Sequence, residues 1–469
     1  MNLPKENGES LITPPFQEWS RLIKGNFQLI NSYRFDLAGI PFLKVRENLR
    51  KRLALYGIQP GNPLLLTGHQ PHFVHPGIWF RFFLLERARE ELGISSAAFV
   101  LDSDLNWGLT VRVPFEFQGE LVSKEIALTL ENKVYESLSS PRKEDWERFT
   151  KEIERSLNFP EAISAKENFS KIERFSWKEE PFSAFYSRLR RYFEGEPDYP
   201  EFPLSEILKE EFRFFFLHIA RNADTFARIY NAANARWRKE RKARSENLPF
   251  PDLRNSEREV ELPFWYLNDG ERLPLFLDSR SNLKAEERVL GKLEDALESY
   301  KIRPRAATLT MFLRLMACDL FLHGLGGGDY EEAVDFMIRD FFQVEPPLFA
   351  KATITLFFPG FDFKERKRLG ELIRKMRKNP ESYLSSEVAQ KERELILRKE
   401  ELKEKKLDRD GYQELQRINR ALLNFLEGDI QLLEGQVRRL EQREEVLAFR
   451  EYPFFFFNPE EVRLRARSA

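Results

Sequence analysis

The stretch LLLTGHQPHFVHPGIWF, residues 64–80, predicts the centre of the fold. Leu64 to Thr67 form an apolar run typical of a short buried strand, and a loop that contains prolines follows. From Pro76-Gly77 onward, apolar side chains recur at helical spacing up to Gly93, a residue typical of a helix C-cap. A second apolar strand, SSAAFV at residues 95–100, comes next. This order of elements predicts a βαβ unit and therefore a parallel sheet with a right-handed crossover.

The segments that follow change their periodicity twice. Residues 111–117 and 121–130 alternate polar and apolar side chains and predict a β-hairpin. From residue 141 the pattern is helical, and its longest element carries an apolar stripe from Phe212 to Trp237. Extended segments return at 259–267 and 273–279, which indicates that the parallel sheet resumes there. We therefore expect an α/β core in two parts, residues 1–140 and 258–380, separated by a helical insertion at 141–257.

The second part of the core contains the sequence HGLGGGDY, residues 323–330. We expect a strand at 320–322 before it, a flexible loop at Gly324–Gly328, a helix at 330–342 after it, and a further strand at 351–358. Successive glycines let a backbone approach a ligand closely, and a following helix start favours an anion. The same glycines are also compatible with a tight packing turn, and the GxGxxG and P-loop patterns are absent.

The C-terminal part predicts a helical hairpin. Val388, Leu395 and Leu402 lie seven residues apart, and a similar apolar pattern follows a break at Asp408–Gly411. Two long helices joined at this break predict an antiparallel coiled coil over residues 381–450, and a coiled coil of this kind predicts a homodimer. The last segment, residues 451–469, contains four successive phenylalanines and is expected to return to the core.

Composition excludes several classes of protein. The chain has 469 residues, a formal net charge of −1 and one cysteine, Cys318. A disulfide framework and a cysteine zinc cluster are therefore excluded, and a reducing compartment is favoured. No apolar run approaches the length of a membrane span, and no signal peptide is evident. We expect a cytoplasmic protein that binds neither membrane nor nucleic acid.

The loop after the first strand holds the candidate chemistry. His69, His72 and His75 lie three residues apart, a pattern that allows a metal site, but the loop contains prolines and no HExxH pattern is present. We therefore predict no metal. Anions bind where a helix begins after a parallel strand, and His75 and Gly77 occupy that place. Asp102 and Asp104 follow the second strand and would hold a substrate ammonium or Mg²⁺, or would merely cap a loop.

Two resemblances bear on function. His75-Pro76-Gly77 is similar to part of the HxGH signature of class I aminoacyl-tRNA synthetases and related nucleotidylyltransferases, with Ile78 at the place of the final histidine. The whole loop more closely resembles the TGQQ…TGP loop of the bacillithiol-biosynthesis cysteine-adding enzyme family (BshC), in which Thr67, Gly68 and Gln70 match. Asp104 matches the acidic EDHD segment of that family, whereas Ser103, Leu105 and Asn106 differ. Arg303-Pro304, the segment HGLGGGDYEEA and the terminal coiled coil continue the resemblance in the same order.

The second resemblance implies a Rossmann-like core, a connecting-peptide insertion and a dimerising coiled coil. It implies a ligase that joins cysteine, or a similar amino acid, to the amine of an amino-sugar such as glucosaminyl malate. The alternatives are a nucleotidyl-transferring enzyme, or a catalytically silent relative that binds a nucleotide or sugar and acts as a dimeric scaffold. The cosubstrate stays open, with ATP or ADP and Mg²⁺ as candidates.

The predicted catalytic residues are His75, Asp102 and Asp104. The predicted binding residues come from three segments, namely Thr67, Gly68, His69, Gln70 and Gly77, then Asn106, then His323, Gly324, Gly326, Gly327, Gly328 and Asp329.

Overall fold

A six-stranded sheet forms the centre of the molecule in a computed structural model that describes residues 3–128, 131–286, 288–294 and 301–469. Its strands lie in the order β1 (Ser10–Thr13), β15 (Phe349–Ile354), β14 (Leu320–His323), β4 (Leu64–His69), β5 (Ser95–Val100) and β8 (Glu201–Pro203). Five of these strands run parallel, and β1 pairs antiparallel with β15 at one edge. The α/β class and the predicted parallel pairing of the first two apolar strands are therefore confirmed.

The chain leaves the middle of this sheet in both directions. After β4 it moves outward to β5 and then β8, whereas the later strands β14 and β15 extend the sheet on the other side of β4. The connections after β4 and β14 therefore diverge. In open α/β sheets, the crevice at the carboxyl ends of two such strands is the place where ligands bind.

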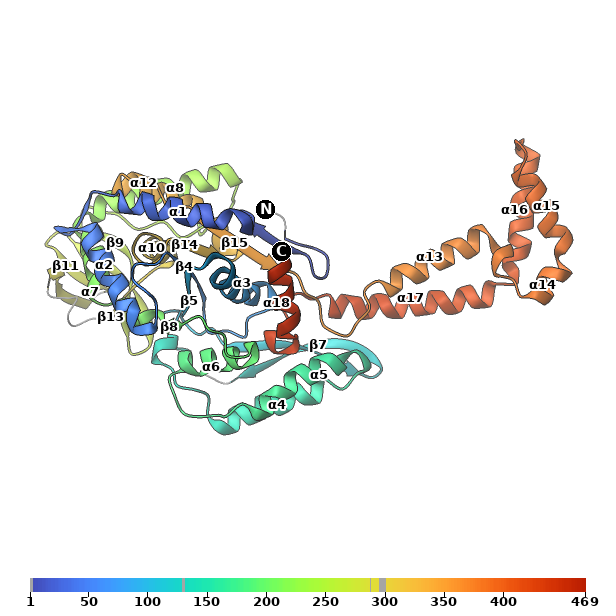
Figure 1. The fold of residues 1–469 in the computed structure, drawn as a ribbon, viewed down its shortest axis with the longest axis horizontal. Coiled ribbons are helices and arrows are strands. Elements are labelled where there is room, and N and C mark those ends of the chain that lie inside the picture. The colour runs from blue at the N-terminus through green and yellow to red at the C-terminus, as the bar shows by residue number, and fades with distance from the viewer. Residues whose placement is uncertain (1–2, 129–130, 287, 295–300) are drawn as a thin grey trace.

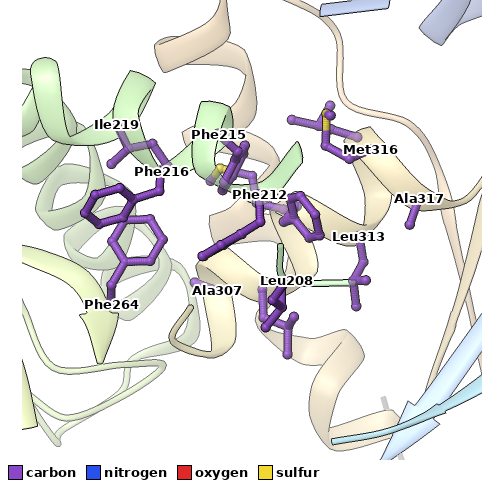
Figure 2. Close-up of a cluster of buried hydrophobic side chains, with 14 of the residues drawn as sticks. Leu208, Phe212, Phe215, Phe216, Ile219, Phe264, Ala307, Leu313, Met316 and Ala317 are labelled. Carbon is purple, nitrogen blue, oxygen red and sulfur yellow. The ribbon is translucent and has the colours of Figure 1, made fainter. Parts of the chain in front are cut away.

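Apolar side chains cover both faces of the sheet because successive residues of a strand point to opposite sides. Leu64 and Leu66 belong to a buried cluster on one face, and Leu65 belongs to a second cluster on the other. Helix α1 (Trp19–Asn31) contributes to both layers, with Trp19 and Ile23 in the second cluster and Ile30 in the first. The first face is covered by α2 (Phe42–Leu53), which adjoins the short pair β2 (Asp36–Leu37) and β3 (Ile40–Pro41), and by α7 (Glu210–Arg221) and α8 (Ala223–Arg241) (Figure 1). Phe212 and Phe216 of α7 pack edge-on against Phe264 in this layer (Figure 2).

Helix α3 (Pro76–Leu92) covers the second face and joins β4 to β5 as predicted. His75 is its N-cap, Pro76 is its first residue, and Gly93 ends it with a left-handed backbone at φ 64°. The C-terminal helix α18 (Pro459–Ser468) packs on α3, and Phe454 to Phe457 are buried beside it. The prediction that the C-terminal segment returns to the core is confirmed.

The segment after residue 258 forms a separate sheet. Strands β9 (Glu259–Asn268), β10 (Glu271–Asp278), β11 (Asn282–Ala285), β12 (Arg288–Lys292) and β13 (Lys301–Pro304) lie in the order β12-β11-β10-β9-β13, and all pairs are antiparallel. The prediction that the parallel sheet resumes at 259 is therefore wrong. The reason is the length of the connections, since a two-residue turn such as Asp269-Gly270 permits only antiparallel neighbours. The parallel strands return at β14, after α10 (Ala306–Phe312) and a wide helical turn (Leu313–Ala317).

The predicted helical insertion contains more than helices. Its elements are α4 (Lys143–Ser156), α5 (Ile163–Phe169), α6 (Phe182–Glu194), β8, α7 and α8, preceded by the predicted hairpin of β6 (Leu109–Phe117) and β7 (Glu120–Leu128). Residues 129–130, at the end of the predicted hairpin, lie outside the described residues. Strand β8 joins the central sheet, and the expected single helix from Phe212 to Trp237 breaks at Asn222. There the Asn222 amide donates to the carbonyl of His218, a side-chain bond that competes with the helical backbone.

The glycine segment after β14 is also more regular than predicted. Residues Leu325–Asp329 form a short helix, α11, where a flexible loop was expected, and α12 (Glu331–Phe342) follows it. The N–H of Gly328 donates to the carbonyl of Gly324 at 2.9 Å and closes this turn. An added Cβ at Gly328 would lie 2.1 Å from Cδ of Lys351, so the turn packs tightly on β15.

Five helices form an arm that projects from the body (Figure 1). They are α13 (Glu365–Lys378), α14 (Ser386–Lys391), α15 (Arg393–Lys403), α16 (Arg409–Asn424) and α17 (Glu427–Leu447). Helix α13 packs on α17 around Ile373 and Ile430, and α15 packs on α16 around Leu402 and Leu422. The prediction of two continuous helices over residues 381–450 is wrong. The arm changes direction between α16 and α17, and α17 packs on α13, which lies before residue 381. None of the described helices combines the length and apolar character of a membrane span.

Candidate functional site

A cavity of about 670 Å³ lies at the carboxyl ends of β4, β5 and β14, where the strand order diverges. The start of α3, Thr353 of β15 and the residues Arg450 and Glu451 after α17 form one side of it, and the antiparallel sheet and α8 form the other. Apolar side chains, including Phe99, Phe321, Leu309 and Leu313, line its interior. A large concave pocket with a few convergent polar groups is the usual form of a small-molecule site.

Ten of the fifteen predicted site residues line this cavity. They are Gly68, His69, Gln70, His75, Gly77, Asp104, His323, Gly324, Gly326 and Gly327. Segments separated by about 250 residues therefore meet at one place. The other five predicted residues, Thr67, Asp102, Asn106, Gly328 and Asp329, do not belong to the cavity wall.

The residues outside the wall have structural partners. Thr67 Oγ1 donates to the carbonyl of Leu322 at 2.7 Å and joins β4 to β14. Asp102 accepts hydrogen bonds from the N–H and hydroxyl of Ser205, and burial raises its pKa to about 6. The Asn106 side chain accepts from the N–H of Gly108 and donates to the carbonyl of Glu131. For Asp102 these contacts favour the alternative that it caps a loop, and Asn106 likewise bonds within its own loop.

Two histidines of the wall are neutral at physiological pH. Burial lowers the pKa of His69 to about 3, helped by the charge of Arg81. Burial also lowers the pKa of His75 to about 3, helped by Arg450 and Arg81. His75 Nδ1 accepts the N–H of Gly77 at 3.1 Å, so its proton lies on Nε2. His69 Nδ1 lies 3.1 Å from the carbonyl of Gln70, so its proton lies on Nδ1 and its Nε2 is an acceptor.

The third histidine of the sequence cluster contacts His69 edge-on, with ring centroids 6.4 Å apart, but lies outside the cavity wall. His72 packs edge-on against Tyr135 and does not line the cavity. Within the described ranges, no group of three or more His, Cys, Asp and Glu side chains is arranged to hold a metal ion.

Asp104 is the carboxylate at the end of β5 that faces the cavity. It accepts from Gln70 Nε2 at 2.9 Å and forms an ion pair with Arg272 of β10. The guanidinium of Arg272 lies 5.1 Å from the ring of Trp265, and that of Arg305 lies 4.1 Å from the same ring. The antiparallel sheet thus contributes a wall of arginine and tryptophan opposite the strand ends.

His323 at the end of β14 is held by a buried carboxylate. Its Nε2 lies 3.1 Å from Oε1 of Glu331, whose other oxygen pairs with Arg314. Burial raises the pKa of Glu331, but the charges of His323 and Arg314 lower it to about 2. The Nδ1 of His323 lies on the side of Gly327, where an added Cβ would come within 2.9 Å of it.

Sequence reasoning missed the arginines of this site. Arg81 lies on α3, Arg450 follows the arm, and Arg272 and Arg305 belong to the antiparallel sheet or its end. One of them left a signal, because Arg81 is the only charged residue between Pro76 and Leu85, in the first half of the helix, which is otherwise apolar. The other three could not be assigned to the site without the fold.

Comparisons with known proteins add no assignment: no protein-family model matches the chain, and no curated protein matches it at a significant level.

Proposed function

We propose that the protein is an enzyme that joins cysteine, or a similar amino acid, to the amine of an amino-sugar such as glucosaminyl malate. The observation that carries the proposal is the presence of opposite charges in one cavity, with Asp104 after β5 and Arg81 of α3 beside Gly68 of β4. Amino acids and acidic amino-sugars carry both an ammonium and a carboxylate, so a site for them needs both signs. The matches at Thr67, Gly68, Gln70 and Asp104 to the cysteine-adding family support the same reaction.

Each group has a role in this proposal. Asp104 receives the ammonium of a substrate, and Gln70 and Arg272 hold its carboxylate in place. The neutral His69 offers Nε2 as a hydrogen-bond acceptor that orients the attacking amine. His75 donates from Nε2 to an oxygen on which negative charge develops. Activation of the acyl group is the chemistry that ATP with Mg²⁺ would supply.

The proposal includes a Rossmann-like core and a cytoplasmic location. From the β8 edge of the sheet, the parallel strands lie in the order β8-β5-β4-β14-β15. Numbered by their order along the chain, with β4 as the first, they lie in the order 3-2-1-4-5. This is the order of the first five strands in the Rossmann fold. The single buried cysteine, Cys318, supports a reducing compartment.

The arm is the part of the chain for which we propose dimerisation through a coiled coil. Several large apolar side chains on it are exposed, including Tyr412 at 60%, Leu432 at 61% and Phe425 at 46%. Such residues are normally covered when they lie close together. Replacing Phe425 and Leu432 by glutamate should halve the mass measured by light scattering while the circular dichroism spectrum is retained. A wild-type protein that is already monomeric would contradict this prediction.

Two alternatives from other classes stand on specific observations. The start of α3 at His75-Pro76-Gly77, with cationic groups nearby, supports a nucleotidyl-transferring enzyme. The substituted acidic segment, in which Asn106 bonds to its own loop at Gly108, supports a silent relative that binds a nucleotide or sugar.

The deciding experiment is mass spectrometry of a reaction with glucosaminyl malate, cysteine, ATP and Mg²⁺. We expect a cysteinyl amide with wild type, none with Asp104→Asn or His75→Ala, and a normal amount with Asp145→Asn, whose carboxylate pairs with Arg142 on distant α4. ATP–pyrophosphate exchange without cysteine would favour nucleotidyl transfer instead. Ligand binding without any turnover would favour the silent relative.

A further inference from the structure

One buried cation in the cavity wall lacks the partner that its equivalents have. The described chain buries seven arginines, namely Arg46, Arg50, Arg81, Arg87, Arg190, Arg303 and Arg314. Six of them form an ion pair with Asp or Glu. Arg81 forms none with any described residue, although only 4% of it is exposed. A buried charge without a counter-charge is costly, so this exception requires a reason.

The hydrogen bonds of Arg81 are also incomplete. Nη1 donates to Thr67 Oγ1 at 3.1 Å and more weakly to the carbonyls of Gly68 and Leu322, at 3.4 and 3.5 Å. Its Nε is buried without a partner. Burial lowers the pKa of Arg81 to about 10, which still leaves the guanidinium charged at neutral pH. The guanidinium therefore faces the cavity between the ends of β4 and β14 with donor capacity to spare.

A second guanidinium reaches the same region from the C-terminal segment. Arg450 donates to Thr353 Oγ1 at 3.2 Å, and its Nε is buried without a partner. A Cβ at Gly77 would lie 2.8 Å from Nη2 of Arg450, so this arginine lies directly against the first turn of α3. The three first N–H groups available there already donate to His75. The helix therefore contributes its dipole, and the arginines contribute the hydrogen-bond donors.

We propose that Arg81 and Arg450, at the N-terminal end of α3, form a subsite for a doubly charged oxyanion group of the ligand. A phosphate monoester and a dicarboxylate share this chemistry, and a guanidinium donates to both through paired N–H groups. The glycines fit this role. Gly77 lets Arg450 approach the helix start closely, and Gly324 borders the guanidinium of Arg81, from whose Cζ an added Cβ would lie at 3.8 Å, an ordinary contact distance. The identity of the substrate that carries the anion rests on the proposed function, but the subsite itself does not.

The test measures binding without turnover. Inorganic phosphate, malonate and acetate are titrated at constant ionic strength into wild type and Arg81→Met, with calorimetry and the thermal midpoint as readouts. We expect phosphate or malonate to raise the wild-type midpoint and acetate to have little effect. Arg81→Met should weaken the binding of the dianion about 10- to 100-fold, since a hydrogen bond to a charged group contributes about 1.5–3 kcal/mol. Its midpoint without anion should not fall, because the substitution removes an uncompensated buried charge.

Arg87→Met is the matched control. Arg87 lies on the same helix and is similarly buried, but it pairs with Glu91 and does not line the cavity. Its loss should lower the midpoint and leave the affinity for dianions unchanged. The proposal is overturned if no dianion stabilises wild type, or if Arg81→Met binds phosphate and malonate as tightly as wild type does.

The two anions separate the two sources of the group. Tighter phosphate binding assigns a phosphorylated ligand, and tighter malonate binding assigns a dicarboxylate. Dianion binding that depends on Arg81, without any amide product, would sink the proposed reaction and keep the subsite. Amide formation that is unaffected in Arg81→Met would contradict the subsite and support the proposed reaction.

Discussion

Replacing Asp319 by asparagine should destabilise the junction on which the site is built. Asp319 is 1% exposed and precedes β14. Its carboxylate pairs with Arg46 at 2.7 Å and with Arg50 at 3.0 Å, and it accepts the N–H of Leu64 at 2.8 Å. It therefore ties α2 to the beginnings of β4 and β14, the two strands whose other ends form the cavity. Asparagine has nearly the same shape but leaves both guanidinium groups without a negative charge.

The size of the effect follows from these contacts. Removing one partner of a buried ion pair costs about 3–5 kcal/mol. The two arginines keep hydrogen bonds to the carbonyls of Leu315, Ala317 and Cys318, so we expect about 4 kcal/mol rather than twice that amount. With an unfolding entropy of about 2.1 cal/mol/K per residue, the 469 residues give about 1 kcal/mol/K. The midpoint of thermal unfolding should therefore fall by about 4 °C.

Differential scanning calorimetry of wild type and Asp319→Asn measures this shift. Glu414→Gln is the control, because Glu414 pairs with Arg398 on the exposed surface of the arm and should show no measurable change. A midpoint of Asp319→Asn within about 1 °C of wild type would refute the reasoning, since it would mean that the carbonyl groups alone compensate the two buried charges.

Three further results are expected. Burial lowers the pKa of His69 and His75 to about 3. Between pH 6.5 and about 3 only the unfolded chain binds these protons, so the free energy of unfolding decreases as the pH is lowered through this range. The double variant His69→Gln/His75→Gln should therefore show a smaller decrease of the thermal midpoint over the same range. Burial raises the pKa of Glu331, but His323 and Arg314 lower it to about 2, so its stabilisation is present above 4.5 and is lost as pH falls toward 2. Glu331→Gln should unfold at a lower temperature than wild type at neutral pH, and its thermal midpoint should decrease less than that of wild type as the pH falls from 4.5 toward 2. A Cβ at Gly68 would lie 2.5 Å from the ring of Phe99, so Gly68→Ala should cost about 1–3 kcal/mol by urea unfolding, whereas Gly326→Ala, with nothing within 4 Å, should not.

The parts of the fold that could be predicted are those that local sequence specifies. The apolar run Leu64–Leu66, the cap at His75 and the left-handed Gly93 determine β4, α3 and β5 with few contributions from elsewhere. The strands at 259–267 were also predicted as strands, but their sheet was not. The alternation of side chains identifies a strand but does not show which other strand it pairs with. Here the pairing of β9 with β10 depends on the two-residue turn at Asp269-Gly270.

The candidate site divides in the same way. His69, His75 and Asp104 follow predicted strands at the sheet edge where ligands bind, and they line the cavity. Asp102 follows the same strand but bonds to Ser205, a residue 103 positions away that no local pattern connects to it. His323 was assigned to the site, but its carboxylate partner Glu331 was not, because their contact depends on the short helix α11 that replaces the expected loop.

The charge balance of buried arginines is the property that only the folded chain reveals. Arg87 finds its carboxylate four residues along the same helix, whereas Arg46 finds one 273 residues away. No sequence window could therefore tell that Arg81, six positions before Arg87, has none among the residues that the structure describes. Both arginines are buried on α3, so burial does not distinguish them, and neither belongs to a recognised motif. The missing counter-charge does distinguish them. Arg87 pairs with Glu91 and stabilises the end of the helix, whereas Arg81 lies at the cavity with a charge that an anionic ligand would neutralise.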